Sequence, residues 1–372
     1  MLLESIWKDE ASADYALNAA NLSFIMPDFL ANGNRLLSIV PANRRQIALE
    51  ADIFVKLIVN GLHIPVKNKT YVTIAPETIL DVGSSFTPGK DYSLYLVQAD
   101  AGADLVCSLN STYPAGATAD NSRKIGGFHT VCANVGTIVG HPYSEYMAGD
   151  IHIHSLWDLK HRPICSPDGM AYVEPLGEWW DIYGQSGTGT STASVFGGTA
   201  TVSRNYMDHV DDFAAVGKNL IWDEGFQIAA EGSNQKTSFS GGAGAEPNPK
   251  TQGGHSDSTG RRMISNFGLE DMCGWLWWWA RGGGWRFSQT THTDSPATSG
   301  PNYEGSYGAD IQRHDDWPGN KGSVWHTDGR AGLLVGALWV NGSASGSRAR
   351  YANYPRSALS TSNGGRACAR SR

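Results

Sequence analysis

The sequence GLLVGALW, residues Gly332–Trp339, carries the strongest fold signal of the chain. It lies within an arginine-rich tail, and its apolar residues indicate that this tail is packed structure rather than a disordered arm. Upstream, Met263–Gly274 leads into a tryptophan-rich stretch that we expect in the core. Downstream, glycine and arginine recur in order, at Gly342, Gly346, Arg348, Arg350, Arg356, Gly364, Gly365 and Arg366.

Arginine is the only charged residue type between Gly329 and Arg372. A planar guanidinium can donate to several backbone carbonyls at once, so arginine suits an internal bracing role better than lysine does. The whole chain has a formal charge of −7, which gives no electrostatic signature of a nucleic-acid-binding protein. We therefore expect internal partners for these arginines, which are Arg330, Arg348, Arg350, Arg356, Arg366, Arg370 and Arg372.

The composition excludes several classes of protein. Charged residues make up 17% of the 372 residues, below the ~25% of ordinary soluble domains, and 44 are glycine. Thirteen tryptophans exclude a disordered chain, which would be poor in aromatic residues and rich in charge. Five scattered cysteines predict no disulfide framework, the first residues predict no secretory signal, and Cys273–Ala280 is too short to span a membrane. A loop-rich, mainly β globular protein made in a reducing cytoplasm is expected.

Short strands separated by Pro and Gly breakers are predicted in the first third, which favours a sandwich. Ile47–Val66 alternates and ends in a turn signal at Asn60–Gly61. Further strands are predicted at Tyr71–Ile74, Tyr92–Val97, Leu105–Leu109, Ala171–Val173 and Trp179–Tyr183. Helical spacing predicts a helix over Tyr206–Asn219, with Met207, Val210, Phe213, Ala214 and Gly217 on one face, and a second over Glu224–Ala230, with Phe226, Ala229 and Ala230 inward. Glu231–Gly260 is expected to be a long surface loop, and it and the polar run Ser288–Gly319 are expected to flank the site as insertions.

The ordered Gly, Trp and Arg residues of the C-terminal third resemble those of the variable proteins of diversity-generating retroelements. The resemblance covers roughly residues 166–372 and implies a C-type lectin fold of the formylglycine-generating-enzyme type. The upstream strands resemble phage tail-fibre modules. Together these imply an α+β, mainly β chain with short helices and long loops: an attachment segment at 1–45, a sandwich-like module at 46–145, and a lectin-like ligand-binding domain at 146–372.

Retroelements of this family mutate template adenines, so an AAC codon for Asn can become a codon for Tyr, Ser, Ala, Leu or Val. The expected variable set comprises eleven residues between Leu338 and Asn363, each of which is Asn or one of these products. Alternation places Ala358, Ser360 and Ser362 on one strand face, whereas Leu359 and Thr361 are assigned to the scaffold. The full set is Leu338, Val340, Asn341, Ala344, Ser345, Tyr351, Asn353, Tyr354, Ala358, Ser360 and Ser362.

A patch of Tyr, Ser and Asn on a fixed scaffold is the chemistry of antibody binding sites. Here the expected scaffold is Trp339, Gly342, Gly346, Arg348, Arg350, Arg356, Gly365 and Arg366. The resemblance implies a homotrimer at the tip of a virion tail fibre, made in the bacterial host cytoplasm, that contacts phage tail components and binds a bacterial surface protein or glycan. It implies neither catalysis, nor a cofactor, nor nucleic-acid binding, nor membrane insertion.

Several alternatives remain open at the level of sequence. A lectin without diversification or a purely structural tail protein would share the fold. A formylglycine-generating type of oxidase would need a cysteine pair, but only Cys368 lies near the C-terminus. Paired carboxylates for glycoside cleavage could come from Asp315, Asp316 and Asp328. His152 and His154, on one face of a predicted strand, could hold Fe, Ni or Zn on a trimer axis, and Glu246–Pro247–Asn248 matches a tripeptide of calcium-dependent lectins.

Overall fold

The computed structural model describes residues 79–99, 102–239, 251–282 and 331–372, together with the backbone of strands β1–β5 and β16–β18. The chain divides into two compact units. One contains Met1–Ser84, Ser93–Gly126 and Asp158–Lys160, and the other contains Ser85–Tyr92, Gly127–Trp157 and His161–Arg372. No helix in the described part is long and apolar enough to cross a membrane.

The first unit is built from short antiparallel strands. Strands β3 (Val55–Val59) and β4 (Leu62–Val66) pair antiparallel with Val59 opposite Leu62, the register that a turn at the predicted position between them requires. A second small sheet has the order β1 (Leu37–Ile39), β2 (Gln46–Leu49), β5 (Thr70–Thr73). A four-stranded sheet has the order β7 (Gly102–Ser108), β6 (Asp91–Ala99), β8 (Ser122–His129), β9 (Trp157–Asp158).

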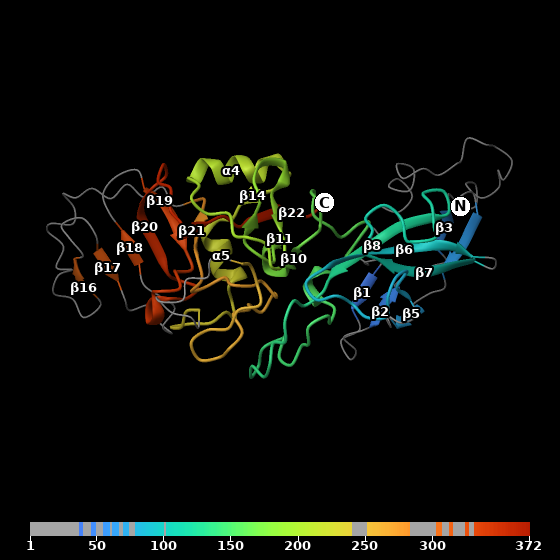
Figure 1. Cartoon of the computed structure of the whole chain (residues 1–372), viewed down its shortest axis with the longest axis horizontal. Helices are drawn as coiled ribbons and strands as arrows, with labels where there is room; N and C mark the ends of the chain where they lie inside the picture. The colour runs from blue at the N-terminus through green and yellow to red at the C-terminus, as the bar shows by residue number, and fades with distance from the viewer. Residues whose placement is uncertain are drawn as a thin grey trace, which may run out of the picture. The chain divides into compact units, whose positions relative to one another are not determined.

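The second unit is organised around the GLLVG sequence, which forms β19 (Ala331–Val335). This strand pairs antiparallel with β20 (Arg350–Pro355) on one side (Figure 1) and with β15 (Trp277–Ala280) on the other. The full order is β16 (Tyr303–Ser306), β17 (Gln312–His314), β18 (Val324–His326), β20, β19, β15, β21 (Asn363–Gly364). Because β16 and β17 lie within Ser288–Gly319, that polar run is not only the loop insertion expected from its composition.

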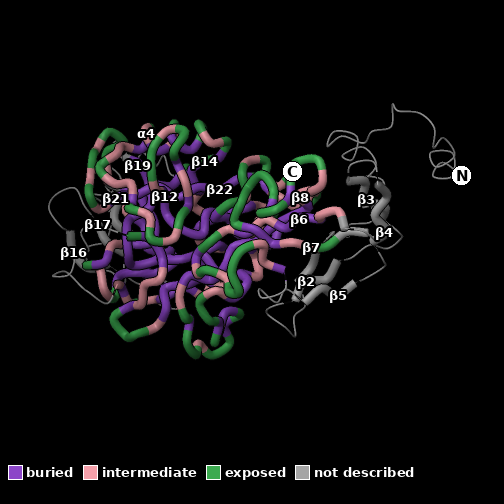
Figure 2. Tube along the Cα trace, turned by 45° about the vertical axis from the view of Figure 1, so that its right-hand side comes forward, coloured by how far each residue is buried: buried purple, intermediate pink, exposed green. Residues whose placement is uncertain are grey.

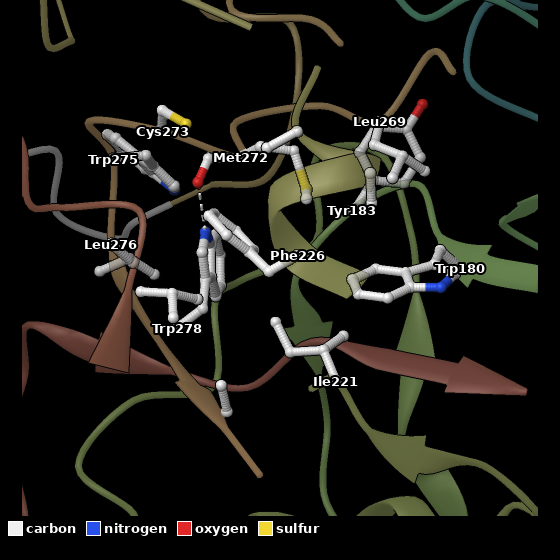
Figure 3. Close-up of a cluster of buried hydrophobic side chains, with 14 of the residues drawn as sticks. Trp180, Tyr183, Ile221, Phe226, Leu269, Met272, Cys273, Trp275, Leu276 and Trp278 are labelled. Carbon is white, nitrogen blue, oxygen red and sulfur yellow. Dashed lines mark hydrogen bonds between the residues drawn. The ribbon is translucent and has the colours of Figure 1, made fainter. Parts of the chain in front are cut away.

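Alternating side chains of β15 serve two different cores. Trp278 and Ala280 pack with Leu333 and Val335 in one cluster, whereas Trp277 and Trp279 pack with Leu334 in another. In the first cluster, Trp278 donates through Nε1 to the carbonyl oxygen of Met272 at 3.1 Å, beside Phe226 (Figure 3). A strand with apolar side chains on both faces is buried on both sides, which explains the continuous apolar run in the sequence.

Smaller elements complete this unit. One four-stranded sheet has the order β10 (Met170–Val173), β11 (Glu178–Asp181), β22 (Ala367–Arg370), β14 (Asn219–Leu220), and β12 (Gln185–Ser186) pairs with β13 (Ala193–Ser194). Short 3-10 helices occur at Ile153–Ser155, Glu174–Leu176, Gly189–Ser191 and Gly342–Ala344. Figure 2 shows buried residues along β22, with exposed residues in the loops of the unit. The prediction of a mainly β chain with short helices is confirmed.

The described residues contain two α-helices, α4 (Tyr206–Ala215) and α5 (Asp223–Ala229). The inward face of α5 is as predicted, with Phe226, Ala229 and Ala230 buried. The predicted face of α4 is wrong: Met207 is 52% exposed, and the helix buries Tyr206, His209, Asp212 and Phe213. Polar His209 and Asp212 face inward because buried partners satisfy them, which helical periodicity of apolar residues cannot detect.

The expected surface loop Glu231–Gly260 is partly internal in its described residues, 231–239 and 251–260. Asn234, Ser238 and Asp257 are buried, and the Ser238 hydroxyl donates to the carbonyl oxygen of Trp339 at 2.6 Å. Lys236 N–H donates to the carbonyl oxygen of Ser345 at 2.8 Å. Hydrogen bonds to a distant segment, rather than apolar content, therefore bury this polar stretch.

Candidate ligand-binding surface

A buried arginine connects the C-terminal strands to other parts of the unit. Arg366 is fully buried, and its guanidinium donates to the carbonyl oxygens of Asp181, Ile182 and Glu270 at 2.8, 2.9 and 2.6 Å. The same group lies 4.7 Å from the centre of the Trp278 ring. Burial lowers its pKa to about 10, so it stays protonated at neutral pH. One side chain directly before β22 thus binds both the end of β11 and the segment around Glu270 that precedes β15.

Arg350, at the start of β20, has equally internal partners. It pairs through Nε with Asp223 at the start of α5, and it donates to the carbonyl oxygens of Ser347 and Ala349 at 3.0 and 2.9 Å. Its guanidinium lies 5.4 Å from the centre of the Phe226 ring. Trp339 is also buried, and its backbone N–H donates to the carbonyl oxygen of Trp275 at 3.1 Å. The base of the surface is therefore fixed by interactions below it.

A bulge in β20 brings two tyrosines to one face. Gly332 and Leu334, two residues apart on β19, pair with Tyr354 and Tyr351, which are three residues apart on β20. The extra residue places both tyrosines on the same side, although residues three apart on a regular strand point to opposite sides. Their ring centres lie 5.7 Å apart. Both rings are half-buried against the tryptophans of β15, Tyr351 at 5.6 Å from Trp277 and Tyr354 at 6.0 Å from Trp279.

The expected variable residues in the turn after β19 differ in exposure: some are exposed and others are buried. Val340 is 49% exposed and Leu338 is partly buried. The Asn341 side chain accepts a hydrogen bond from Leu338 N–H at 2.7 Å, so it also shapes the turn. Ala344 and Ser345 are buried, and Ser345 has no exposed surface. Their side chains are shielded from solvent, because the segment 233–239 packs beside them.

The prediction that Ala358, Ser360 and Ser362 share a strand face is wrong. Strand β20 ends at Pro355, and residues 356–362 form a loop of turns before β21. The three residues are half-buried in this loop, whereas Leu359, assigned to the scaffold, is 64% exposed. Arg356, also assigned to an inward role, is exposed at the start of the same loop.

Two glycines of the expected scaffold have clear backbone roles. Gly342 has a φ of +49° where the 3-10 helix after the turn begins. A Cβ atom on Gly365 would lie 2.5 Å from Nδ1 of His209 and 2.6 Å from Oε1 of Gln185, so no side chain fits there. Gly346 is buried and Arg348 is half-buried. The side chain of Asn353 lies outside the described residues.

The geometry that suggested a metal site is not present. Ile153–Ser155 forms a 3-10 turn rather than a strand, so His152 and His154 do not share a strand face. His152 is buried, with Nε2 3.1 Å from the carbonyl oxygen of Gly268 and Nδ1 3.0 Å from the Tyr143 hydroxyl. Burial lowers its pKa to about 3, which keeps the ring neutral. The His154 ring lies edge-on to Phe267, with ring centres 5.6 Å apart.

The residues of the enzyme alternatives are either buried or outside the described part. Cys368 is buried in β22, and burial raises its pKa to about 12, so its thiol is poorly suited to nucleophilic chemistry. Cys273 is also buried. Asp315, Asp316, Asp328 and the segment Glu246–Asn248 lie outside the described residues. In the described part, no group of three or more His, Cys, Asp or Glu side chains could hold a metal ion.

Sequence reasoning missed residues that border the surface from other elements. Tyr206 and Met207 of α4 lie next to the 356–362 loop, because Tyr206 N–H donates to the carbonyl oxygen of Arg356 at 3.0 Å. Trp277 and Trp279 form the floor beneath Tyr351 and Tyr354. Met207 was predicted to lie on the buried face of the helix but is exposed. No local signal in the sequence indicated that it lies beside the ligand surface.

Comparison with known proteins places this arrangement among phage proteins. Residues 41–158 match the family model described as the Mtd second domain. The chain is 30% identical over 293 residues to the tail fiber receptor-binding protein of Bordetella phage BPP-1, covering 71% of this chain and 67% of that protein.

Solved structures share the fold. The I1 variant of the major tropism determinant aligns with a TM-score of 0.63 and 23% identity, over 91% of this chain and 84% of that one. The M1 variant aligns with a TM-score of 0.64 and 22% identity, over 91% and 83%. The resemblance inferred from the C-terminal residues is thereby confirmed, and the chain belongs to the family of the major tropism determinants, the phage tail fibre receptor-binding proteins.

Proposed function

We propose that this chain is the receptor-binding protein of a phage tail fibre and that its C-terminal surface contacts a ligand on the bacterial cell. The observation that carries the proposal is the tyrosine pair on β20. Tyr351 and Tyr354 are half-buried on a floor of Trp277 and Trp279, so their rings are held while their outer faces reach solvent. Rigid aromatic residues lose little conformational entropy on binding, which makes them effective anchors.

Membership of the family supports this role, because the relative in Bordetella phage BPP-1 is described as a tail fiber receptor-binding protein. We assign the ligand surface to the members of the expected variable set that reach solvent. These are Leu338, Val340, Asn341, Tyr351, Tyr354, Ala358, Ser360 and Ser362. Ala344 and Ser345 would act only by shaping the turn, since they are buried.

Diversification by a retroelement, a homotrimeric state and attachment to other tail components are further parts of the proposal. A trimer on a fibre would multiply weak contacts through effective concentration. No catalytic step is assigned to the surface. Sequencing of sibling copies tests diversification: differences should fall on the expected variable set, with a template repeat and a reverse-transcriptase gene beside the coding sequence. Differences spread evenly along the chain would instead indicate a tail lectin without diversification.

A cell-binding assay tests the role of the surface. Labelled full-length chain is titrated onto a panel of bacterial strains, alongside the variants Tyr351→Ser and Tyr354→Ser. Tyr113→Ser is the matched control, because Tyr113 is 44% exposed and lies in the other unit. We expect saturable binding to a subset of strains, lost in the first two variants and retained in the control. Binding that survives both surface changes, or binding to no strain, would contradict the proposal.

A further inference from the structure

One corner of the ligand surface is formed by residues outside the expected variable set. It consists of Arg356 and Leu359 in the 356–362 loop and Met207 in the first turn of α4, and is called the Arg356 corner below. Met207 is 52% exposed, Leu359 is 64% exposed, and Arg356 is also exposed. Two large apolar side chains and a cation are thus exposed on two neighbouring segments that belong to the expected scaffold.

The Arg356 corner is held in place by backbone hydrogen bonds. Tyr206 N–H donates to the carbonyl oxygen of Arg356 at 3.0 Å, and Ser203 N–H donates to that of Ser360 at 2.7 Å. Asn205 and Asp208 cap the start of α4 reciprocally, at 2.9 and 3.1 Å, which fixes its first turn. The loop that carries Ala358, Ser360 and Ser362 is therefore continuous with the corner, and a ligand that touches these residues lies beside it.

The side chain of Arg356 lies against an aromatic ring. Its guanidinium lies 5.0 Å from the centre of the Tyr206 ring, which itself lies edge-on to Trp279 at 5.8 Å. A Cβ on Gly332 would lie 3.2 Å from Cγ of Arg356, so the arginine stem crosses this glycine. Among the described residues, Arg356 forms no ion pair. A guanidinium held over an aromatic ring keeps N–H donors at its edge, where a carboxylate can bind in a bidentate manner.

We propose that the Arg356 corner is a second, constant part of the ligand surface, which binds a carboxylate flanked by apolar side chains on a protein receptor. The inference rests on the proposed function and deepens it. The expected variable residues would adapt to the particular receptor, while Arg356 supplies the same charged contact each time. Met207 and Leu359 would exclude water from that contact, which strengthens it.

A protein segment fits the Arg356 corner better than a glycan or a second copy of the chain does. Sugar rings stack on flat aromatic faces, but the exposed side chains here are the flexible aliphatic chains of Met207 and Leu359. Thioether and branched aliphatic groups instead suit apolar side chains of a protein partner. A second copy of the chain bound at the Arg356 corner would have to leave Tyr351 and Tyr354 open for the ligand. The tyrosines of β20 and the corner adjoin each other, because the 356–362 loop follows β20 directly.

Selection from a displayed random peptide library on the full chain tests the proposal. We expect enriched peptides that carry Asp or Glu next to Leu, Ile, Phe or Met. Their affinity should fall about tenfold or more with Arg356→Gln and with Met207→Asn. Arg356→Lys should recover only part of the loss, because an ammonium group cannot bind a carboxylate in a bidentate manner. Arg370→Gln, at an exposed arginine of β22, is the matched control and should leave the affinity unchanged.

Each other outcome overturns the inference. Peptides that depend on Tyr351 but tolerate Arg356→Gln would leave the proposed function intact and remove the corner. A library that yields no enriched peptides also counts against it, as does Arg356-dependent binding of polyglucuronate in place of peptides. A change in sedimentation coefficient caused by Arg356→Gln or Met207→Asn would assign the corner to contacts between copies of the chain. Thermal melts of the variants, matched to the parent, show that the fold is retained.

Discussion

Replacing Arg366 with Lys should destabilise the C-terminal unit strongly. The arginine donates three hydrogen bonds to backbone carbonyls, at 2.6–2.9 Å, from a fully buried position. A lysine ammonium cannot span the carbonyls of Asp181 and Glu270 together, so about two of these bonds are lost. At ~1.5–3 kcal/mol for each bond to a charged group, the free energy of unfolding should fall by about 3–6 kcal/mol.

The protonation of the new side chain adds to this effect. Burial already lowers the pKa of Arg366 to about 10, and the same burial would lower that of a lysine from its ordinary ~10.4. The substitution also removes a guanidinium stacked 4.7 Å from the centre of the Trp278 ring. An arginine-to-lysine change that conserves formal charge is therefore not conservative at this position.

Urea denaturation followed by tryptophan fluorescence measures the effect, because Trp278 lies beside the substituted side chain. Arg370→Lys is the control, since Arg370 is exposed on β22 and its replacement should change stability by no more than about 0.5 kcal/mol. The reasoning is refuted if Arg366→Lys stays within about 1 kcal/mol of the parent with an unchanged denaturant slope.

Three further predictions concern stability. Burial lowers the pKa of His152 to about 3 and that of His209 to about 4, both below the ordinary 6.5, so the unfolded chain binds protons first on acidification. Stability should therefore be lost as pH falls from 6.5 to 5, by on the order of 2 kcal/mol for each histidine, in urea titrations at both pH values; equal stability at both would contradict it. Gly365→Ala should cost about 1–3 kcal/mol, because its Cβ would lie 2.5 Å from Nδ1 of His209, and a melting temperature equal to that of the parent would rule this out. Ser203→Gly should stabilise by about 0.5–1 kcal/mol by relieving a φ of +59°, whereas Ser203→Ala, which keeps the strained backbone, should not.

The elements of the fold were largely predictable from local sequence. The β3–β4 pairing and strands β6, β7, β10 and β11 follow from alternation and turn chemistry, and α5 follows from apolar spacing. The face of α4 was not predictable, because His209 and Asp212 are buried by partners distant in sequence. The same reason applies to segment 231–239, where Lys236 N–H and the Ser238 hydroxyl donate to the carbonyl oxygens of Ser345 and Trp339.

The candidate site, like the fold, was predictable from the sequence only in part. Adenine-derived residue types marked the segment 338–362, and the arginine pattern pointed to internal bracing of the kind seen at Arg350 and Arg366. Exposure within that segment could not be predicted, since it depends on neighbours from elsewhere in the chain. Ala344 and Ser345 are buried beside the 233–239 segment, whereas Leu359 and Arg356, assigned to the scaffold, are exposed.

The sequence by itself determined the β class, the buried GLLVG strand and the use of arginine rather than lysine, because these depend on residue type and short-range spacing. Only the tertiary structure decided which side chains form the surface. The bulge in β20 places Tyr351 and Tyr354 on one face, and it exists through pairing with β19 rather than through any local signal. Likewise, α4 joins the surface through backbone hydrogen bonds from Ser203 and Tyr206 to the 356–362 loop. Pairing between β19 and β20, together with contacts from α4 more than 100 residues away, therefore determines what this chain presents to a ligand.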